Sequence, residues 1–225
     1  MAIAQHPLYG SNKLGKAISK AHSVSGPDGG SFDFGRLPIV SVSNGAAGVV
    51  STHVYDDGLK LYFSSLGTNT IGNQPLQVAK GMNYQYDSAN NEGFNWSLAN
   101  SLNKTHIDSG PGIERYKIGS AAFYAKLTFN LVDVSTTDDT HFGFRKVQAP
   151  VAIDDYTDVA SLAIIASAST ADVNIATALN NAAMTETDTT DNLADDTDTT
   201  WEVLVSSAGV VTYKIDGSAP STTAA

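Results

Sequence analysis

The alternation of apolar and polar positions is clearest over residues 200–217, TWEVLVSSAGVVTYKIDG. Every second residue from Trp201 to Val205 is apolar, and the alternation resumes from Val211 to Ile215. A period of two places one set of side chains on one face of a strand. Gly209 stands in the break, where a hairpin turn needs a residue that tolerates positive φ. The pattern therefore predicts a β-hairpin with Trp201 as the anchor of one face, closed by a second turn at Asp216-Gly217.

Further strand patterns precede this hairpin. Residues 123–134 (FYAKLTFNLVDV) alternate most strongly, and residues 160–167 (ASLAIIAS) form the continuous apolar run of a buried strand. Asp56-Asp57-Gly58 separates two strand-like runs and predicts a hairpin. The remaining expected strands are Leu37–Val42, Gly48–Tyr55, Leu59–Ser64 and His141–Val147.

Three stretches carry weaker patterns. Residues 171–183 are typical of a short helix or a poor strand, and residues 185–200 (TETDTTDNLADDTDTT) indicate an exposed acidic loop. Residues 1–35 form an irregular N-terminal segment, and residues 36–225 form the predicted β-sandwich domain. The N-terminal segment is either a frayed end or an arm that docks on an acidic neighbour through Lys13, Lys16 and Lys20.

Composition narrows the setting of these strands. The chain of 225 residues is long enough for one sandwich with its own core, and its Ser, Thr, Gly and Asn content favours short strands joined by polar loops. It has no cysteine, which excludes disulfides and thiolate metal sites. No apolar run reaches about 18 residues, so no membrane span is expected, and without a signal-peptide pattern we expect synthesis in a reducing cytoplasm.

The net charge of −10 is unevenly distributed. After Lys146 the chain carries twelve acidic residues and one base, Lys214. An acidic surface repels nucleic acid phosphates, so the C-terminal part is not expected to bind nucleic acid. A hydrated, aggregation-resistant exterior is the simplest interpretation of this charge.

The familiar catalytic patterns are missing. A glycosidase needs two carboxylates across a cleft, and the Glu-x-Asp-x-Glu cluster of jelly-roll glucanases does not occur. Nor do a Gly-x-Ser-x-Gly elbow, a His-Glu-x-x-His zinc motif or a phosphate-binding Gly-x-x-x-x-Gly-Lys loop. The sequence thus predicts no catalytic, cofactor-binding or metal-ligating residues, with one alternative: a calcium ion on Asp195, Asp196 and Asp198, although Trp201 replaces the glycine that an EF-hand loop requires.

Aromatic side chains lie among asparagines between residues 83 and 96. Rings stack on sugar faces and amides bond sugar hydroxyls, so this composition is compatible with a glycan-binding platform. Aromatic residues also commonly cover the edge of a sandwich, and the sequence leaves both interpretations open. The candidate glycan-binding residues are Tyr84, Tyr86, Phe94 and Trp96.

The order FYAKLTFNL, GFRK, ASLAIIAS and TWEVLVSSAGVVTYKIDG resembles concanavalin A-like (laminin-G-like) jelly-roll domains over roughly residues 120–217. The pattern W-x-V…G-x-V-x-Y-x-x-D-G is carried here by Trp201, Val203, Gly209, Val211, Tyr213, Asp216 and Gly217. More closely, the chain resembles virion structural proteins of tailed bacteriophages that contain this domain. The resemblance implies an all-β, antiparallel jelly-roll β-sandwich.

The same resemblance implies a non-enzymatic virion protein, foremost a capsid decoration (cement) protein that bridges capsomers. Its partners would be the major capsid protein or other virion proteins, with homo-oligomers expected and no nucleic acid or membrane. The alternative is a lectin-like module on a tail fibre or capsid surface. Members of the family usually continue past Asp-Gly with closing strands, whereas SAPSTTAA follows here. Either a closing strand is lost, another chain supplies it, or the sequence is truncated. An unpaired edge would be a liability for a free monomer, which favours assembly with neighbours.

Overall fold

A computed structural model describes two parts of the chain at different levels of detail. Side chains are described for residues 116, 118–119, 121–135, 137–146, 148, 155–165 and 171–223, with backbone alone at 136, 169 and 170. Before them, the backbone of six strands is described. The chain divides into a unit of residues 1–116 and a unit of residues 117–225. The boundary predicted at residue 36 lies outside the described residues.

The strands described in the first unit form two antiparallel sheets. One has the strand order β1-β2-β3-β6 and the other pairs β4 with β5. The predicted hairpin around Asp57-Gly58 is confirmed by the pairing of β2 with β3, whereas β4, β5 and β6 were not anticipated from the sequence. The strands are β1 (Ile39–Ser43), β2 (Val50–Asp56), β3 (Leu59–Leu66), β4 (Leu76–Val78), β5 (Gly81–Asn83) and β6 (Gly93–Ser97).

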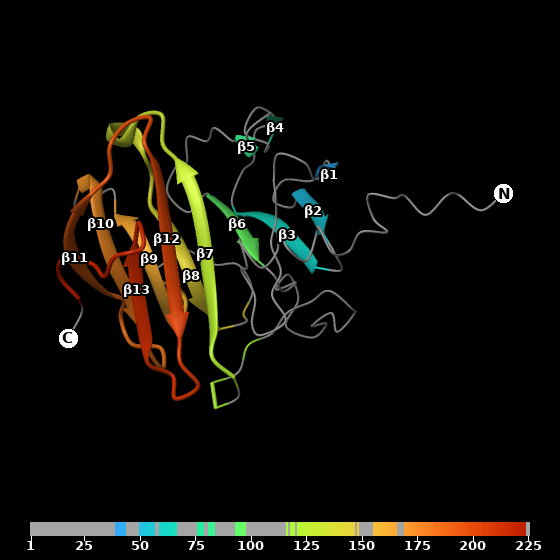
Figure 1. Ribbon diagram of the computed structural model, residues 1–225. Coiled ribbons are helices and arrows are strands. Elements are labelled where there is room, and N and C mark those ends of the chain that lie inside the picture. Colours follow the sequence, from blue (N-terminus) through green and yellow to red (C-terminus); the bar gives the residue numbers. More distant parts are fainter. Residues whose placement is uncertain are drawn as a thin grey trace, which may run out of the picture. The chain divides into compact units, whose positions relative to one another are not determined.

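The second unit is a sandwich of two antiparallel sheets, with orders β11-β10-β9-β8 and β13-β12-β7 (Figure 1). All-β architecture and the sandwich are therefore confirmed, while the jelly-roll connectivity stays a prediction. Apart from strands, the described part contains one short 3₁₀ helix, η2 (Val134–Thr136), and no helix able to span a membrane. The strands are β7 (Phe123–Asn130), β8 (Thr140–Arg145), β9 (Val159–Ile165), β10 (Ser169–Ala178), β11 (Thr185–Asn192), β12 (Asp198–Val205) and β13 (Val211–Ile215).

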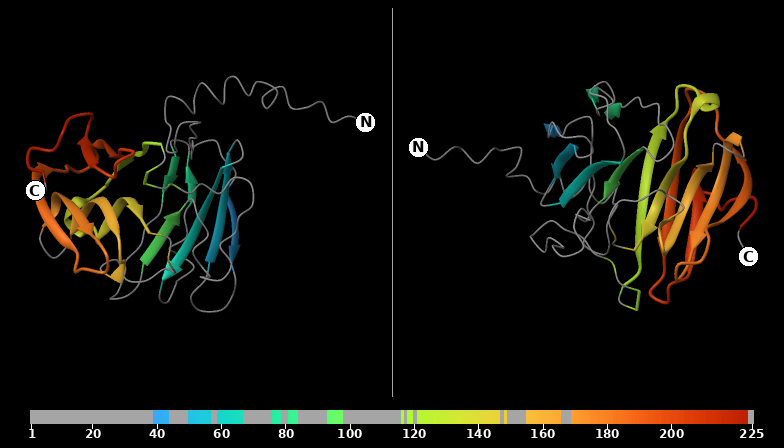
Figure 2. Two further views of the ribbon diagram at one scale, coloured as in Figure 1. Left: turned by 90° about the horizontal axis from the view of Figure 1, so that it is seen from below. Right: turned by 180° about the vertical axis from the view of Figure 1, so that it is seen from behind.

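The core of the sandwich fills the space between these two sheets, whose layers can be seen in the left view of Figure 2. Trp201 and Val203 of β12 are fully buried, as the period-two pattern predicts. Trp201 meets the ring of Phe129 edge-on, with 4.8 Å between ring centroids. From the opposite sheet, Leu162, Ile164, Val173 and Ile175 complete the buried cluster together with Tyr213.

The predicted hairpin at residues 200–217 is confirmed in detail. β12 and β13 pair from Trp201 opposite Ile215 to Val205 opposite Val211. Gly209 turns the chain with φ at +86°, where a Cβ would be strained. β12 also pairs along its other side with β7, so that Trp201 lies in the middle of its sheet.

The acidic stretch 185–200 was wrongly expected to be a loop, because its first half is strand β11. Thr189 is fully buried, and its hydroxyl donates to the Val173 carbonyl of β10. A bulge interrupts the pairing of β10 with β11, and Thr190 adopts φ of +63° there. The Asp188 carboxylate stabilises that turn by accepting the Thr190 N–H at 2.8 Å. β-branched threonines thus keep this polar segment in the sheet.

Residues 218–223 connect the edges of the two sheets. Ser218 exchanges backbone hydrogen bonds with Ile215 at the end of β13. The chain then reaches β11, where Asp191 accepts hydrogen bonds from the N–H and hydroxyl of Ser221 at 2.9 and 3.0 Å. Thr222 N–H donates to the Thr189 carbonyl at 2.9 Å, and Pro220 is buried between these anchors. The segment therefore fastens β13 to β11 on one side of the sandwich.

Candidate functional site

The four candidate glycan-binding residues fall in the first unit. Tyr84 and Tyr86 lie outside the described residues. Phe94 and Trp96 belong to β6, where they are paired with Ser65 and Phe63 of β3. Their side chains are not among those described, so the glycan-binding interpretation stays a prediction. The docking-arm lysines Lys13, Lys16 and Lys20 also lie outside the described residues.

The candidate calcium ligands lie at the turn between β11 and β12. The Asp195 carboxylate accepts the Val134 N–H at 2.8 Å, and the Asp198 carboxylate accepts from the Asn130 side chain at 3.2 Å. Asp196 adopts φ of +52° and donates its N–H to the Leu131 carbonyl. Two of the three carboxylates therefore act as acceptors that hold η2 and β7 to this turn. Within the described residues, no group of three or more potential metal ligands is found.

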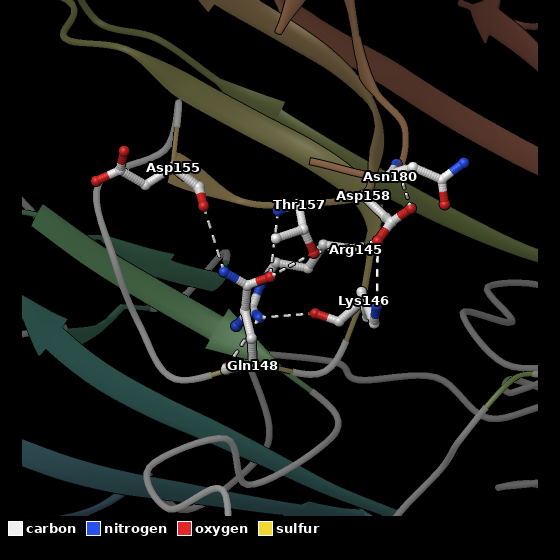
Figure 3. Close-up of polar contacts among 7 residues, drawn as sticks. All are labelled: Arg145, Lys146, Gln148, Asp155, Thr157, Asp158 and Asn180. Carbon is white, nitrogen blue, oxygen red and sulfur yellow. Dashed lines mark hydrogen bonds and ion pairs between the residues drawn. The ribbon is translucent and has the colours of Figure 1, made fainter. Parts of the chain in front are cut away.

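A polar network fastens the connection between β8 and β9 (Figure 3). The Gln148 side chain accepts from the N–H and hydroxyl of Thr157 at 3.2 and 3.1 Å. The Arg145 guanidinium donates to the Gln148 carbonyl at 3.3 Å and lies 4.4 Å from the ring centroid of Tyr156. Burial lowers the pKa of Arg145 from its ordinary value, against the opposing influence of Tyr156. These contacts hold both ends of the connection in place, which is a structural task.

A second part of this network centres on Asp158. Its carboxylate accepts the Asn180 N–H at 3.0 Å and lies 3.5 Å from the Lys146 ammonium. The Asn180 hydrogen bond, with smaller contributions from Thr157 and Lys146, lowers the pKa of Asp158 below its ordinary value. Asp158, just before β9, thereby ties the turn between β10 and β11 to the residue that follows β8 (Figure 3).

Half-buried His141 and buried Ser161 form a pair on neighbouring strands β8 and β9. His141 Nδ1 lies 3.0 Å from the Ser161 hydroxyl oxygen, and that hydroxyl donates to the Ala176 carbonyl at 3.4 Å. His141 Nε2 is buried without a hydrogen-bond partner. Burial lowers the pKa of His141 to about 4, although Asp139 raises it in part. The imidazole is therefore neutral at pH 7, and its Nδ1 shares a hydrogen bond with the Ser161 hydroxyl.

The outer face of the sheet β13-β12-β7 is lined with polar side chains that satisfy one another across strands. We call these pairs the outer ladder. They stabilise the pairing of β7 with β12, and they leave few of these polar groups available to a ligand. The pairs are Lys126 Nζ with Glu202 Oε1 at 2.9 Å, Thr128 Oγ1 with Thr200 Oγ1 at 3.0 Å, and Asn130 Nδ2 with Asp198 Oδ1 at 3.2 Å.

The backbone of β13 offers the hydrogen-bonding groups that the outer ladder lacks. Ser206 N–H donates to Val210 O, and Asp216 N–H donates to Thr200 O, so the even-numbered residues of β13 bond to β12. The odd-numbered residues point away from β12, and Ile215 is satisfied by Ser218. We call the outward N–H and C=O groups of Val211 and Tyr213 the β13 edge. None of the strands that the structure describes pairs with it (Figure 1).

Comparison with protein-family models, with curated proteins and with solved structures found no match for this chain. The features on which a functional proposal rests are therefore those of the chain itself. The sequence left open whether a closing strand after Asp216-Gly217 is lost, supplied by another chain or truncated. The open groups of β13 follow from its pairing with β12. The outer ladder was missed, although the polar positions of FYAKLTFN and TWEVLV could have indicated it once the two strands were paired.

Proposed function

We propose that this chain is a non-enzymatic structural protein of a tailed-bacteriophage virion, foremost a capsid decoration protein that bridges capsomers. The observation that carries this proposal is the β13 edge, which presents backbone groups that no described strand pairs with, beside the polar outer ladder. Unpaired strand edges are sites where another chain adds a strand. The resemblance to phage virion proteins supplies the virion context.

The chemistry of the second unit supports an assembly role. Several polar side chains among its described residues, including Arg145, Asp158 and Asp191, fasten loops and strands to one another. A sandwich built this way is a stiff block, suited to transmit load between neighbours. The virion would be its location, after synthesis in the host cytoplasm, and the major capsid protein would be its main partner.

Purified particles test this proposal. Particles from an infected culture would be banded on a density gradient, and the ratio of this chain to the major capsid protein would be measured by quantitative mass spectrometry. The proposal predicts a fixed ratio across the particle band, compatible with many symmetry-related copies. A chain found only in the soluble fraction, or at a few copies per particle, would overturn the decoration role.

The alternative is a glycan-binding module on a fibre or on the capsid surface, favoured by the aromatic and asparagine residues between 83 and 96. A glycan array separates the two proposals. Binding that is lost in Trp96→Ala, but retained in Tyr124→Ala on the second unit, would favour the lectin-like role. Equally weak signals from the unmodified chain, Trp96→Ala and Tyr124→Ala would contradict the lectin-like role.

A further inference from the structure

We propose that the β13 edge pairs antiparallel with the β13 edge of a second copy of this chain, with Thr212 on the two-fold axis. This names a partner and a register for the assembly role, and it rests on the proposed function for its purpose. Its argument uses only the geometry of β13. The pairing would join two three-stranded sheets into one continuous sheet.

The register follows from which backbone groups are open. Only Val211 and Tyr213 have outward groups available on β13, because Ser218 already satisfies Ile215. Directly opposed residues in an antiparallel pair either exchange two hydrogen bonds or none. Placing Val211 opposite Tyr213 of the second copy, and Tyr213 opposite its Val211, uses all the open groups of both edges. Thr212 then meets its own symmetry mate as the non-hydrogen-bonded pair.

The side chains on the outer face fit this register. Thr212 is exposed and meets a second threonine, a favourable cross-strand pair. Lys214 lies opposite Val210 of the second copy, whose side chain is 63% exposed in the single chain. The methylene stem of a lysine covers apolar surface while its ammonium stays in water. The pairing thus shields the exposed valine twice, once in each copy.

The side chains on the inner face also fit. Val211 is partly buried and packs against the core, and Tyr213 is buried. In the proposed register each Val211 becomes the cross-strand neighbour of the second copy's Tyr213 on the core side. The pairing extends the apolar layer of each sandwich across the junction, which adds apolar burial to the four new hydrogen bonds.

The charge pattern opposes a second copy less at this edge than along the acidic strands. The part of the chain after Lys146 is strongly acidic, and its one basic residue, Lys214, lies on β13. The register centred on Thr212 sets no two like charges directly opposite each other, because Lys214 faces Val210. The acidic residues between β11 and β12 are not part of β13. A copy of the chain can therefore approach along β13 with less repulsion than along its acidic strands.

A single cysteine at the axis tests the pairing. The chain has no cysteine, so Thr212→Cys introduces one thiol at an exposed position. Opposed residues of a non-hydrogen-bonded pair have Cα atoms about 4.5 Å apart, within the range that a disulfide spans. Mild oxidation of the purified full chain should convert most of Thr212→Cys to a covalent dimer that reduction reverses, as seen on a non-reducing gel.

Two matched cysteine variants fix the register. In the proposed pairing Lys214→Cys lies about 14 Å from its symmetry mate, which is four strand residues away. Thr128→Cys, exposed on β7 of the same sheet, reports random collisions. We expect both to cross-link at least tenfold more slowly than Thr212→Cys. Equal rates for the three variants, or fastest cross-linking of Lys214→Cys, would overturn the register.

A backbone variant tests the hydrogen bonds themselves. Val211→Pro removes an outward N–H, and the ladder to β12 is kept because that N–H does not point toward β12. Val211→Thr keeps the donor. In sedimentation equilibrium we expect Val211→Pro to weaken dimerisation at least tenfold, since one hydrogen bond is lost in each copy. Circular dichroism of the monomer should confirm that both variants fold.

The particle assay separates this inference from the proposed function. In one outcome, Thr212→Cys stays monomeric under oxidation while Val211→Pro abolishes binding to particles. Another virion protein would then occupy the β13 edge, and the second-copy proposal would be wrong. A cross-linked dimer that never associates with particles would support the pairing and contradict the virion role.

Discussion

At the scale of single residues, the core of the sandwich contains polar atoms that lack partners. The Tyr213 hydroxyl and Trp201 Nε1 are both buried without a hydrogen bond in the described residues. Burial raises the pKa of Tyr213 to about 12. A buried polar group without a partner costs about 1–3 kcal/mol. The rings of these two residues therefore fill the core, while their unpaired polar atoms lower its stability.

Replacing the Tyr213 hydroxyl tests that cost. Tyr213→Phe keeps the ring and should raise the free energy of unfolding by about 1 kcal/mol, measured by urea denaturation. Tyr213→Ala should lower it by about 3–5 kcal/mol, since it leaves a cavity in the same place. Destabilisation by Tyr213→Phe of 1 kcal/mol or more would show that the hydroxyl is hydrogen-bonded in solution.

His141 predicts a pH dependence of stability. Its pKa is about 4 in the folded chain and near 6.5 when unfolded, so the unfolded state binds the proton more tightly. Stability is then complete above about pH 6.5 and falls as the pH drops toward 4, by roughly 3 kcal/mol in total. Carboxylates with lowered pKa, such as Asp158, act at lower pH.

Urea titrations at several pH values measure this effect. His141→Gln should remove most of the loss between pH 6.5 and 4.5 and leave the loss at lower pH in place. Identical pH profiles for the two proteins would contradict a buried, neutral His141.

At the scale of elements, the sequence predicted strands where apolar alternation or an apolar run was strong, as at Phe123–Asn130 and Asp198–Val205. It left residues 171–183 open between a helix and a poor strand, and most of that stretch is strand β10. It failed at β11, because that strand is held by hydroxyls and a bulge instead of apolar burial. Thr189 contributes one donor and one acceptor, to Val173 O and from Asp191 N–H. No hydropathy pattern reports such bonds. The sequence raised an unpaired sheet edge as one alternative. Which residues of β13 direct their N–H and C=O groups outward depends on the pairing with β12, which the sequence does not give.

Thr189→Val tests the role of this hydroxyl in β11. The substitution keeps the β-branched shape and removes two hydrogen bonds, leaving the Asp191 N–H without its acceptor. We expect a loss of about 1–3 kcal/mol in the free energy of unfolding. Thr187→Val, on the same strand and facing the same side, is the control and should change stability by less than 0.5 kcal/mol, roughly the size of a surface substitution. Equal effects of the two variants would contradict the claim that the Thr189 hydroxyl stabilises β11.

At the scale of the whole molecule, the net charge of −10 opposes association of copies. Dimerisation through the β13 edge should therefore strengthen as salt is added, since the Debye length falls from about 30 Å at 0.01 M to about 8 Å at 0.15 M. Sedimentation equilibrium at these two ionic strengths measures the change. A dimer that weakens with added salt would indicate an interface held by opposite charges instead of backbone pairing.

The measurement that tests the central claim most directly is cryo-electron microscopy of intact particles, with residues 117–223 located in the density. The account predicts sandwiches on the capsid surface in copies related by icosahedral symmetry, with neighbouring copies in contact through β13. Absence of the chain from the particles would contradict the virion role, and a position confined to the tail or a fibre tip would contradict decoration of the capsid.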